Sequence, residues 1–330
     1  MAERILVTGG AGYIGSVVVA QLLARGYEPL VFDDLSNGHR AALPAAAKLI
    51  VGDTADRATL DHVFSEYRPQ AVMHFAAFIE AGESMRHPEK FFRNNTANAL
   101  TLLEVLLAHN VKRFVFSSTA ALYGTPEKTP IEESARLQPT NAYGESKLLV
   151  EQMLDWLHRI HGLRYACLRY FNAAGAEGEQ GEDHHPESHL IPIALQVALG
   201  ERTEVAIFGT DYPTPDGTCV RDYVHVSDLA VAHLLVLEAL KERERLIYNL
   251  GNGQGFSVRE VIETVRKVTG HAIPAGESPR RPGDPAMLVA SSEKIKRELG
   301  WDPKYADLET IVRSAWEWRK AHPNGYDLKA

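Results

Sequence analysis

The chain has 330 residues, 45% of them hydrophobic and 24% charged, and 35 basic against 43 acidic residues give it a net charge of −8. This composition is typical of a globular protein of one large or two coupled domains, and the negative charge argues against a general nucleic-acid-binding surface. The two cysteines, Cys167 and Cys219, lie far apart, which excludes a disulfide framework and favours a reducing, cytoplasmic setting. Because we find no signal peptide and no apolar run of about 20 residues, we expect no membrane association.

The first predicted elements are a strand at 4–8 and a helix at 16–25, joined by a turn that contains Gly9, Gly12 and Gly15. Glycines at this spacing let the backbone turn tightly and approach a pyrophosphate at the N-terminus of the helix. A strand, a glycine turn and a helix in this order therefore predict a phosphate-binding turn.

A second predicted strand, at 28–32, ends at Asp33 and Asp34. An acid about 20 residues beyond the glycines is placed to bind the ribose hydroxyls of an adenine dinucleotide. The two acids favour NAD over NADP, whose extra phosphate usually meets an arginine, although Arg40 is near enough to make this a preference only.

Strands and helices then alternate. We predict strands at 48–51, 70–74, 113–116 and 164–170, and helices at 56–67, 88–108 and 140–160. This alternation predicts an α/β fold with a doubly wound parallel sheet (a Rossmann fold), which binds its ligands at the carboxyl ends of its strands. The glycine turn, Asp33, Asp53, the 75–79 segment, Thr119 and Phe171–Asn172 should all meet at that edge.

The predicted helix at 140–160 carries Tyr143 and Lys147 four residues apart, so both side chains lie on one face. A nearby ammonium favours the phenolate form and lowers the tyrosine pKa from its usual value of about 10. Beside a cofactor, such a pair can remove a proton from an alcohol.

The polar loop at 175–189 contains His184, His185 and His189 together with several acids. The spacing of these histidines and acids matches no ordered ligand motif. We therefore expect a solvated loop near the entrance of the substrate site, and no metal. After it we predict helices at 190–199, 226–240 (capped by Ser227 or Asp228), 257–268, 291–299 and 306–321, and strands at 205–208 and 246–250. The segments at 209–221 and 279–284 should be a turn-rich loop and a rigid basic turn.

With these residues identified, the chain resembles the extended short-chain dehydrogenase/reductases, and among them the UDP-sugar 4-epimerases. The stretches that carry the resemblance are 7–15, 74–77, 94–95, 116–124, 143–147, 168–172, 207–225, 248–251 and 279–284. The resemblance implies a Rossmann domain for NAD at 1–172, to which 225–250 returns, and a smaller C-terminal α/β domain at 173–330, mainly for the UDP-sugar. It also implies a homodimer built on the helices near 90–108 and 140–160.

The activity implied is the reversible interconversion of UDP-glucose and UDP-galactose, with transient oxidation at C4 by tightly bound NAD. Tyr143 would move the proton of the 4-hydroxyl, Lys147 would bind the nicotinamide ribose and lower the pKa of Tyr143, and Thr119 would bond the reacting oxygen. A useful base at pH 7 needs that pKa lowered by about three units, or about 4 kcal/mol.

The resemblance also implies the site residues. The catalytic residues implied are Tyr143, Lys147 and Thr119. The implied NAD contacts are Gly9, Gly12, Tyr13, Ile14, Gly15, Asp33, Asp34, Leu35, Ser36, Asn37, Gly38, Asp53, Thr54, Phe75, Ala76, Ala77, Phe78, Ile79, Asn94, Tyr143, Lys147 and Phe171. The implied substrate contacts are Thr119, Tyr143, Asn172, His189, Leu190, Arg221, Arg281 and Asp284.

Several alternatives stay open at this point. A sugar-nucleotide 4,6-dehydratase would carry an Asp-Glu pair where this chain has Ala120 and Ala121, so simple epimerisation is favoured. The substrate could instead be UDP-N-acetylglucosamine or UDP-glucuronate, and the gatekeeper of the sugar pocket falls at Met287 or Leu288. A non-catalytic NAD-binding sensor would not need Thr119, Tyr143 and Lys147 together.

Overall fold

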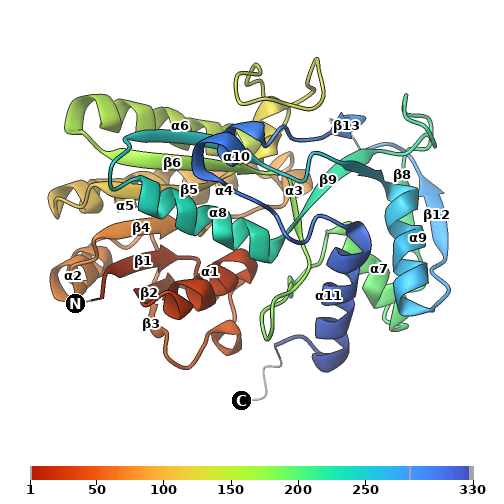
Figure 1. The fold of residues 1–330 in the computed structure, drawn as a ribbon, viewed down its shortest axis with the longest axis horizontal. Coiled ribbons are helices and arrows are strands. Elements are labelled where there is room, and N and C mark those ends of the chain that lie inside the picture. Colours follow the sequence, from red (N-terminus) through yellow and green to blue (C-terminus); the bar gives the residue numbers. More distant parts are fainter. Residues whose placement is uncertain (1, 282–283, 327–330) are drawn as a thin grey trace.

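A computed structural model describes residues 2–281 and 284–326, and it confirms the predicted doubly wound parallel sheet (Figure 1). Seven strands lie in the order β10-β6-β5-β4-β1-β2-β3, and all neighbours are parallel. Their bounds are β1 Arg4–Thr8, β2 Glu28–Asp33, β3 Lys48–Val51, β4 Ala71–His74, β5 Arg113–Thr119, β6 Arg164–Tyr170 and β10 Arg245–Leu250. Six strands come from the first 170 residues, and β10 returns from the second half of the chain.

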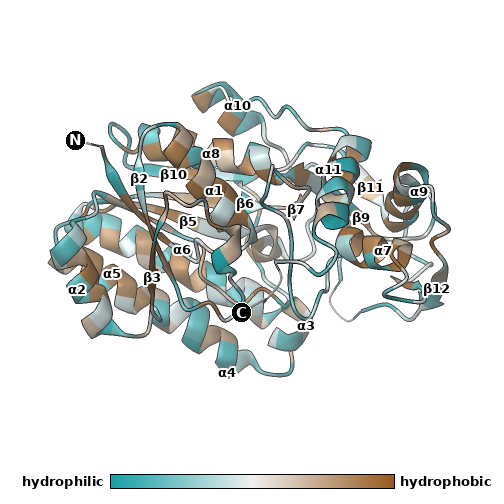
Figure 2. Cartoon of the chain, turned by 90° about the horizontal axis from the view of Figure 1, so that it is seen from below, coloured by the Kyte–Doolittle hydropathy of each residue, from teal (hydrophilic) through white to brown (hydrophobic). Residues whose placement is uncertain are grey.

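Helices cover both faces of this sheet and enclose two hydrophobic cores. One core packs the sheet against α1 (Tyr13–Ala24), α8 (Val226–Ala239) and α10 (Glu293–Leu299). The other packs it against α2 (Arg57–Tyr67), α5 (Asn98–Ala108) and α6 (Ala142–His161). Figure 2 shows hydrophobic residues along the strands and on the helices around them, as burial of apolar surface on both faces requires.

Other elements from residue 172 onward form a second, smaller part of the chain, at the right of Figure 1. A four-stranded mixed sheet contains β7 (Asn172–Ala174), β9 (Val220–His225), β11 (Gly255–Ser257) and β13 (Met287–Leu288), and β8 (Val205–Phe208) pairs with β12 (Ala275–Ser278). A third core holds α7 (Leu190–Ala198), α9 (Val258–Thr269) and α11 (Leu308–Ala321) together. The short elements are η1 Arg40–Ala42, α3 Ala81–Ser84, α4 Pro88–Phe91, η2 Phe92–Ala97 and η3 Ala120–Tyr123.

The predicted elements of the large sheet are present, but the prediction is wrong in several places. The first helix begins at Tyr13, directly after the glycine turn, and the predicted helix at 88–108 is α4, a π-helical segment and α5 in succession. Part of the predicted loop at 209–221 is strand β9, and β11, β12 and β13 were not predicted. Short strands of this kind are specified by their partners more than by local pattern.

Helix α8 is not capped by either predicted residue. Its N-cap is His225, whose Nδ1 accepts a hydrogen bond from the backbone N–H of Ser227 at 3.1 Å. Asp56 caps α2 and Ser257 caps α9, each by accepting a backbone N–H. None of the helices in the described part of the chain is long and apolar enough to cross a membrane.

A buried ion pair ties α6 to the sheet. The guanidinium of Arg169, in β6, donates from Nε and Nη2 to the two carboxylate oxygens of Glu151, in α6, at 3.0 and 2.6 Å. Both side chains are almost fully buried. Ser118 Oγ donates to Glu151 at 2.6 Å, and Arg169 Nη1 donates to the hydroxyl of Tyr123 at 2.8 Å. Strand, helix and the turn after β5 therefore share one polar network.

We expect Glu151→Gln to lower the free energy of unfolding by about 3–5 kcal/mol, because it leaves the Arg169 guanidinium buried without its counter-charge. Denaturant unfolding measures the change. Glu104→Gln is the matched control, since Glu104 pairs with Arg57 on the surface and such a pair contributes at most about 1 kcal/mol. Equal losses in the two variants would contradict the proposed importance of the buried pair.

Candidate active site

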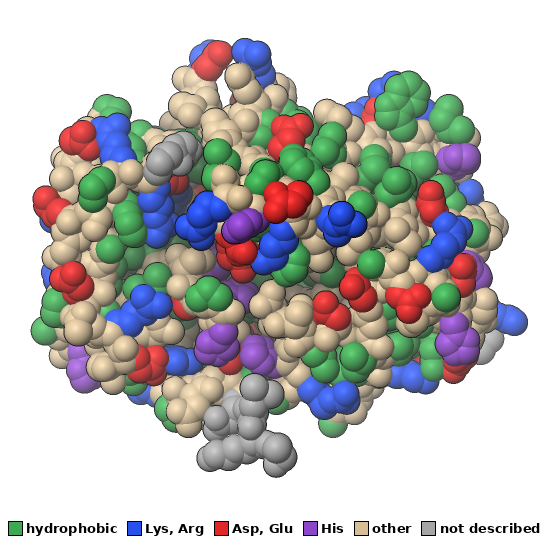
Figure 3. Space-filling model, turned by 180° about the vertical axis from the view of Figure 1, so that it is seen from behind, with side chains coloured by type: hydrophobic (Ala, Val, Ile, Leu, Met, Phe, Trp, Pro, Cys, Tyr) green, Lys and Arg blue, Asp and Glu red, His purple; other side chains and the backbone are tan. Residues whose placement is uncertain are grey.

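A cavity of about 380 Å³ opens at the carboxyl ends of the parallel strands. Figure 3 shows charged and histidine side chains around a hollow in the middle of one face. Every predicted cofactor residue except Leu35 lines the cavity. The other lining residues are Phe32, Gly52, Glu80, Ser117, Ser118, Thr119, Tyr170, Asn172, Ala173, Glu182, His184, His185 and His189.

The glycine turn lets two stretches of backbone meet at the floor of this cavity. Gly9 has a φ of +69°, and a Cβ there would lie 2.4 Å from the backbone N of Ala76. A Cβ on Gly15 would lie 2.3 Å from the carbonyl oxygen of Gly9. Helix α1 begins directly after Gly12 without a side-chain cap, so the N–H groups of its first turn remain available to an anion.

Asp33 stands at the end of β2, where the sequence predicts the ribose-binding carboxylate. Its two oxygens accept backbone hydrogen bonds from Ala11 and Leu35, both at 2.9 Å. Burial raises the pKa of Asp33, and these two hydrogen bonds oppose the rise. The carboxylate is thus held in place against the glycine turn, while the side chain of Leu35 does not reach the cavity.

Asn95 fastens the 75–79 segment to helix α6. Its amide pairs with both backbone groups of Phe78, at 2.9 and 3.0 Å, and Nδ2 also donates to Ser146 Oγ at 3.0 Å. Asn95 lies in the π-helical segment η2, and the neighbouring Asn94 lines the cavity. A π-helical turn of this kind often marks a functional site.

The side chains of Tyr143 and Thr119 both line the cavity and are hydrogen-bonded to each other. Thr119 ends β5, and Tyr143 lies in the first turn of α6, whose N-cap is Asn141. Burial raises the pKa of Tyr143, a hydrogen bond with the Thr119 side chain lowers it, and the charge of Glu80 raises it further. The protein by itself therefore does not produce the lowered tyrosine pKa that the sequence predicts.

Lys147 lies one turn after Tyr143, and its side chain is only 2% exposed. Its ammonium donates to the carbonyl oxygen of Ser117 at 3.0 Å and lies 4.9 Å from the ring centre of Phe116. Burial lowers the pKa of Lys147 to about 7. An anion or hydroxyl arriving beside it would stabilise its charged form.

Two residues near the catalytic group have structural partners instead. Ser118 binds Glu151, as described above, and His74 Nδ1 lies 2.6 Å from the hydroxyl of Thr8. Burial, aided by the charge of Lys147, lowers the pKa of His74 to about 3, so the ring is neutral near pH 7. Ser118 and His74 therefore have structural partners and are poor candidates for proton transfer.

The sequence did not single out Tyr170 or Glu80, which also line the cavity. Tyr170 Oη lies 2.5 Å from Nε2 of buried His233 and is thereby held at the end of β6. A polar residue at the end of a central strand is the signal that could have identified Tyr170. Glu80 lies in a loop, where the sequence carries no such signal.

The predicted substrate residues separate into two groups. Asn172 and His189 line the cavity with Thr119 and Tyr143, whereas Leu190, Arg221, Arg281 and Asp284 do not. Arg221 Nη2 donates to Asp284 Oδ1 at 3.1 Å, and the guanidinium of Arg281 lies 3.9 Å from the ring centre of Phe208. Pro282 and Gly283, within the predicted basic turn, lie outside the described residues.

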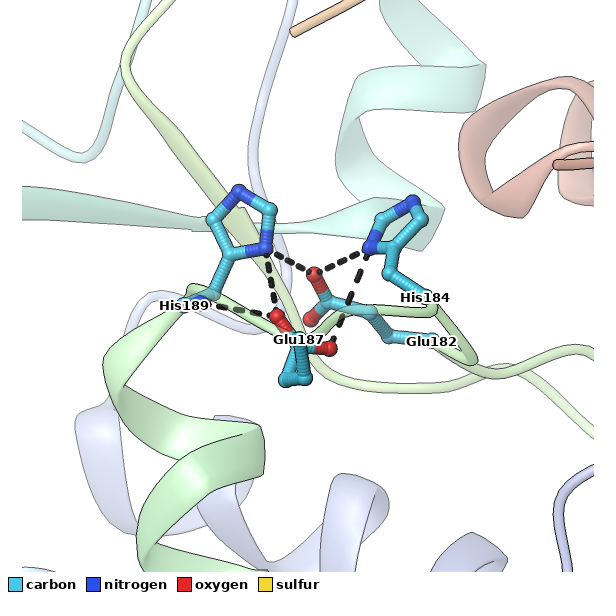
Figure 4. A group of neighbouring side chains, drawn as sticks. All are labelled: Glu182, His184, Glu187 and His189. Atoms are coloured by element: carbon cyan, nitrogen blue, oxygen red, sulfur yellow. Dashed lines mark hydrogen bonds and ion pairs between the residues drawn. The ribbon is translucent and has the colours of Figure 1, made fainter. Parts of the chain in front are cut away.

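The loop at 175–189 borders the cavity, as predicted, but only part of it is solvated. The side chains of Glu182 and Glu187 are only 8% and 3% exposed, and both pair with His184 and His189 (Figure 4). Neighbouring Asp183 faces another way and accepts the backbone N–H of Tyr326 at 2.8 Å. Tertiary packing against the C-terminal segment buries acids that local composition alone assigns to solvent.

Comparison with known proteins places this chain among relatives of nearly equal length. Residues 5–251 match the NAD dependent epimerase/dehydratase family. A UDP-glucose 4-epimerase of Halalkalibacterium halodurans is 56% identical over 328 residues, which cover 98% of either chain. A crystal structure of a UDP-glucose 4-epimerase has a TM-score of 0.95 at 52% identity, with 98% of this chain and 100% of that chain covered. The enzyme of Bifidobacterium longum, in complex with NAD+ and UDP, has a TM-score of 0.94 at 40% identity, with 98% and 99% covered.

We expect Gly15→Ala to reduce dinucleotide binding and to destabilise the protein by about 1–3 kcal/mol, because its methyl group would overlap the backbone of Gly9. The measurements are the amount of bound NAD per chain and the thermal unfolding midpoint. Gly82→Ala is the control, since a Cβ there meets no atom within 4 Å. Unchanged NAD content in Gly15→Ala would refute this account of the turn.

Proposed function

The chain belongs to the NAD-dependent epimerase/dehydratase family, and from this premise we infer that it interconverts UDP-glucose and UDP-galactose by epimerisation at C4. The observation that carries the proposal is the meeting of Tyr143, Thr119 and Lys147 at the cavity that the glycine turn and Asp33 also line. One cavity thus offers a proton-transfer group and a dinucleotide-binding turn. Ala120 and Ala121 follow Thr119 in η3, and neither can supply the further acid or base that elimination of water needs.

The residues on the cavity wall suit reversible oxidation of an alcohol. Bound NAD supplies a hydride acceptor, a hydride donor for the return step and a positive charge near the phenol. Tyr143 takes the proton of the 4-hydroxyl and later returns it. Thr119 hydrogen-bonds the reacting oxygen and Tyr143, and the Lys147 ammonium stabilises the phenolate.

We assign the dinucleotide to the side of the cavity formed by β1, β2 and the turn after β4. The first turn of α1 would face the pyrophosphate, and Asp33 would accept hydrogen bonds from the adenosine ribose. The fit rests on the glycine turn, where the backbone of Gly9 lies so close to Ala76, and Gly15 so close to Gly9, that no side chain fits at Gly9 or Gly15. The predicted cofactor residues other than Leu35 are retained in this assignment.

The UDP-sugar would lie toward the smaller part of the chain, and we retain the division at residue 172 as a proposal. Asn172 and His189 border the cavity there. Arg221 and Arg281 supply the cationic groups that a diphosphate prefers, and Asp284 orients Arg221 through their ion pair. Met287 and Leu288 form β13 beside Val220 and Arg221, so the predicted gatekeeper position adjoins this region.

We expect Tyr143→Phe to lower kcat for UDP-galactose by about 10²- to 10⁴-fold, because it removes the group that moves the proton. Thr119→Val should also lower kcat. Tyr305→Phe is the matched control, since Tyr305 is 43% exposed and does not line the cavity. A wild-type rate in Tyr143→Phe would refute the mechanism.

A panel of UDP-glucose, UDP-galactose, their N-acetyl forms and UDP-glucuronate completes this test by measuring substrate range. Turnover of the uronate alone would favour the alternative epimerase. Tight NAD binding without turnover of any member would favour a sensor. The cytoplasmic location stays a prediction from the sequence.

We also propose that the chain forms a homodimer through α5 and α6. Trp156 and Ile160, four residues apart on α6, are 62% and 68% exposed, and Leu100 on α5 is 40% exposed. Exposed apolar side chains on neighbouring helices are typical of a protein interface.

We expect the double variant Trp156→Glu/Ile160→Glu to be monomeric in light scattering, because it places charges in the proposed interface. Val51→Glu is the control, since Val51 is 53% exposed on β3, away from these helices. A wild-type protein that is monomeric at micromolar concentration would contradict the proposal.

A further inference from the structure

Four side chains of the loop before α7 converge on one point. Within eight residues, Glu182, His184, Glu187 and His189 place one possible ligand atom each within 4.8 Å of all the others. Figure 4 shows both imidazole rings directing Nδ1 inward, toward the two carboxylates between them. We propose that this cluster is a binding site for one divalent transition-metal ion, Zn²⁺ in particular, that braces the wall of the active-site cavity.

The distances suit a tetrahedral ion. Bonds of about 2.0–2.1 Å from zinc to nitrogen and oxygen place neighbouring ligand atoms about 3.3 Å apart. His189 Nδ1 lies 2.7 Å from Glu182 Oε1 and 2.9 Å from Glu187 Oε1, and His184 Nδ1 lies 3.2 Å from Glu182 Oε1 and 3.9 Å from Glu187 Oε2. These separations bracket the required value, so small side-chain rotations would seat the ion.

The charge of the cluster is compatible with a bound dication. Glu182 and Glu187 are buried, and in the described part of the chain their only cationic partners within 4 Å are His184 and His189. Burying two carboxylates is costly unless positive charge compensates them. Two protonated imidazoles balance this pair, and one dication held by two neutral imidazoles balances it equally well.

The ligand types select the metal. Two imidazole nitrogens and two carboxylate oxygens are a donor set that suits Zn²⁺, whereas Mg²⁺ and Ca²⁺ prefer oxygen ligands alone. Neither cysteine belongs to the cluster. The spacing Glu-x-His-x-x-Glu-x-His matches no ordered ligand motif, so the sequence predicts no metal, and only the folded loop brings these four side chains together.

The loop is held in a form that could receive the ion. Glu187 Oε1 accepts the backbone N–H groups of Ser188 and His189, each at 2.7 Å, which orients that carboxylate. The backbone N–H of Gly181 donates to Tyr326 Oη at 2.7 Å. A small second cavity of about 20 Å³ borders Glu182, His184 and Glu187, which is room for one water-sized particle.

The position of the cluster suggests what the ion does. Glu182, His184 and His189 also line the main cavity, which provides a path of entry. The loop joins β7, which carries Asn172, to α7, which begins at Leu190. Both residues are predicted substrate contacts, so an ion in this loop would fix the substrate side of the cavity without taking part in proton transfer.

The test uses the full chain produced without a histidine tag. The protein is first stripped with a chelator and then titrated with ZnCl₂ in a calorimeter, which should give about one zinc per chain. Elemental analysis of the zinc-loaded protein should give the same ratio. Zinc should also raise the thermal unfolding midpoint, since a ligand of the folded state stabilises it. Magnesium chloride should do neither. Binding of Mg²⁺ in place of Zn²⁺, or no tight binding of Zn²⁺, would overturn the proposal.

Two variants locate the ion. His184→Asn and Glu187→Gln should each weaken zinc binding at least about tenfold, because each removes a ligand. His185→Asn is the matched control: it lies on the same loop, but its side chain is 72% exposed and faces Asp183 instead. Equal zinc affinity in the wild type and His184→Asn would overturn the assignment.

Because Glu187 is buried and its variant could fail to fold, X-ray absorption of the zinc-loaded wild type gives an answer that needs no variant. We expect four ligands with imidazole scattering and no sulfur. The Co²⁺-loaded protein should show the intense visible absorption of four-coordination. A sulfur ligand or a six-oxygen shell would refute the site.

Discussion

The active-site geometry depends on the buried ion pair between Arg169 and Glu151. Tyr143, Lys147 and Glu151 follow one another at intervals of four residues along α6, so they share one face of the helix. The Glu151 carboxylate binds Arg169 of β6 and Ser118 of β5. Ser118 directly precedes Thr119 in β5. The network therefore fixes the position of α6 relative to β5 and brings Tyr143 close to Thr119.

The same network extends to the strand that returns from the second half of the chain. Tyr123 accepts a hydrogen bond from Arg169 and donates one to Asn249 of β10 at 2.7 Å. Residues from four separate segments thus hold one another in a region without bulk water, where an unpaired charge would be costly. Rigid support of this kind is what proton transfer between fixed groups requires.

The other half of the cavity depends on close backbone contact. Glycines at positions 9 and 15 allow the turn after β1 to touch the segment after β4, and Asn95 fixes that segment to α6. The dinucleotide side and the catalytic side are therefore connected through the 75–79 segment. The loop at 182–189 borders the remaining side, with Glu182 and Glu187 buried beside His184 and His189.

The sequence alone was sufficient for the parallel sheet, because apolar strands that alternate with helices and a glycine turn have few other ways to bury their surface. It was also sufficient to nominate Tyr143, Lys147, Thr119 and Asp33, since helical spacing and strand ends are local features. It could not identify Glu151, Tyr170 or strand β9, whose roles depend on partners distant in the chain.

The loop at 175–189 is where the prediction from sequence and the folded structure differ most. Its composition, dominated by glycines and acids, predicts solvation, yet Gly181 and Asp183 bond to Tyr326, and the Glu182 and Glu187 side chains are buried beside two imidazoles. Local pattern determines which elements form and which chemical groups they carry. Tertiary structure decides which groups are desolvated together, because burial and distance arise only when remote segments meet.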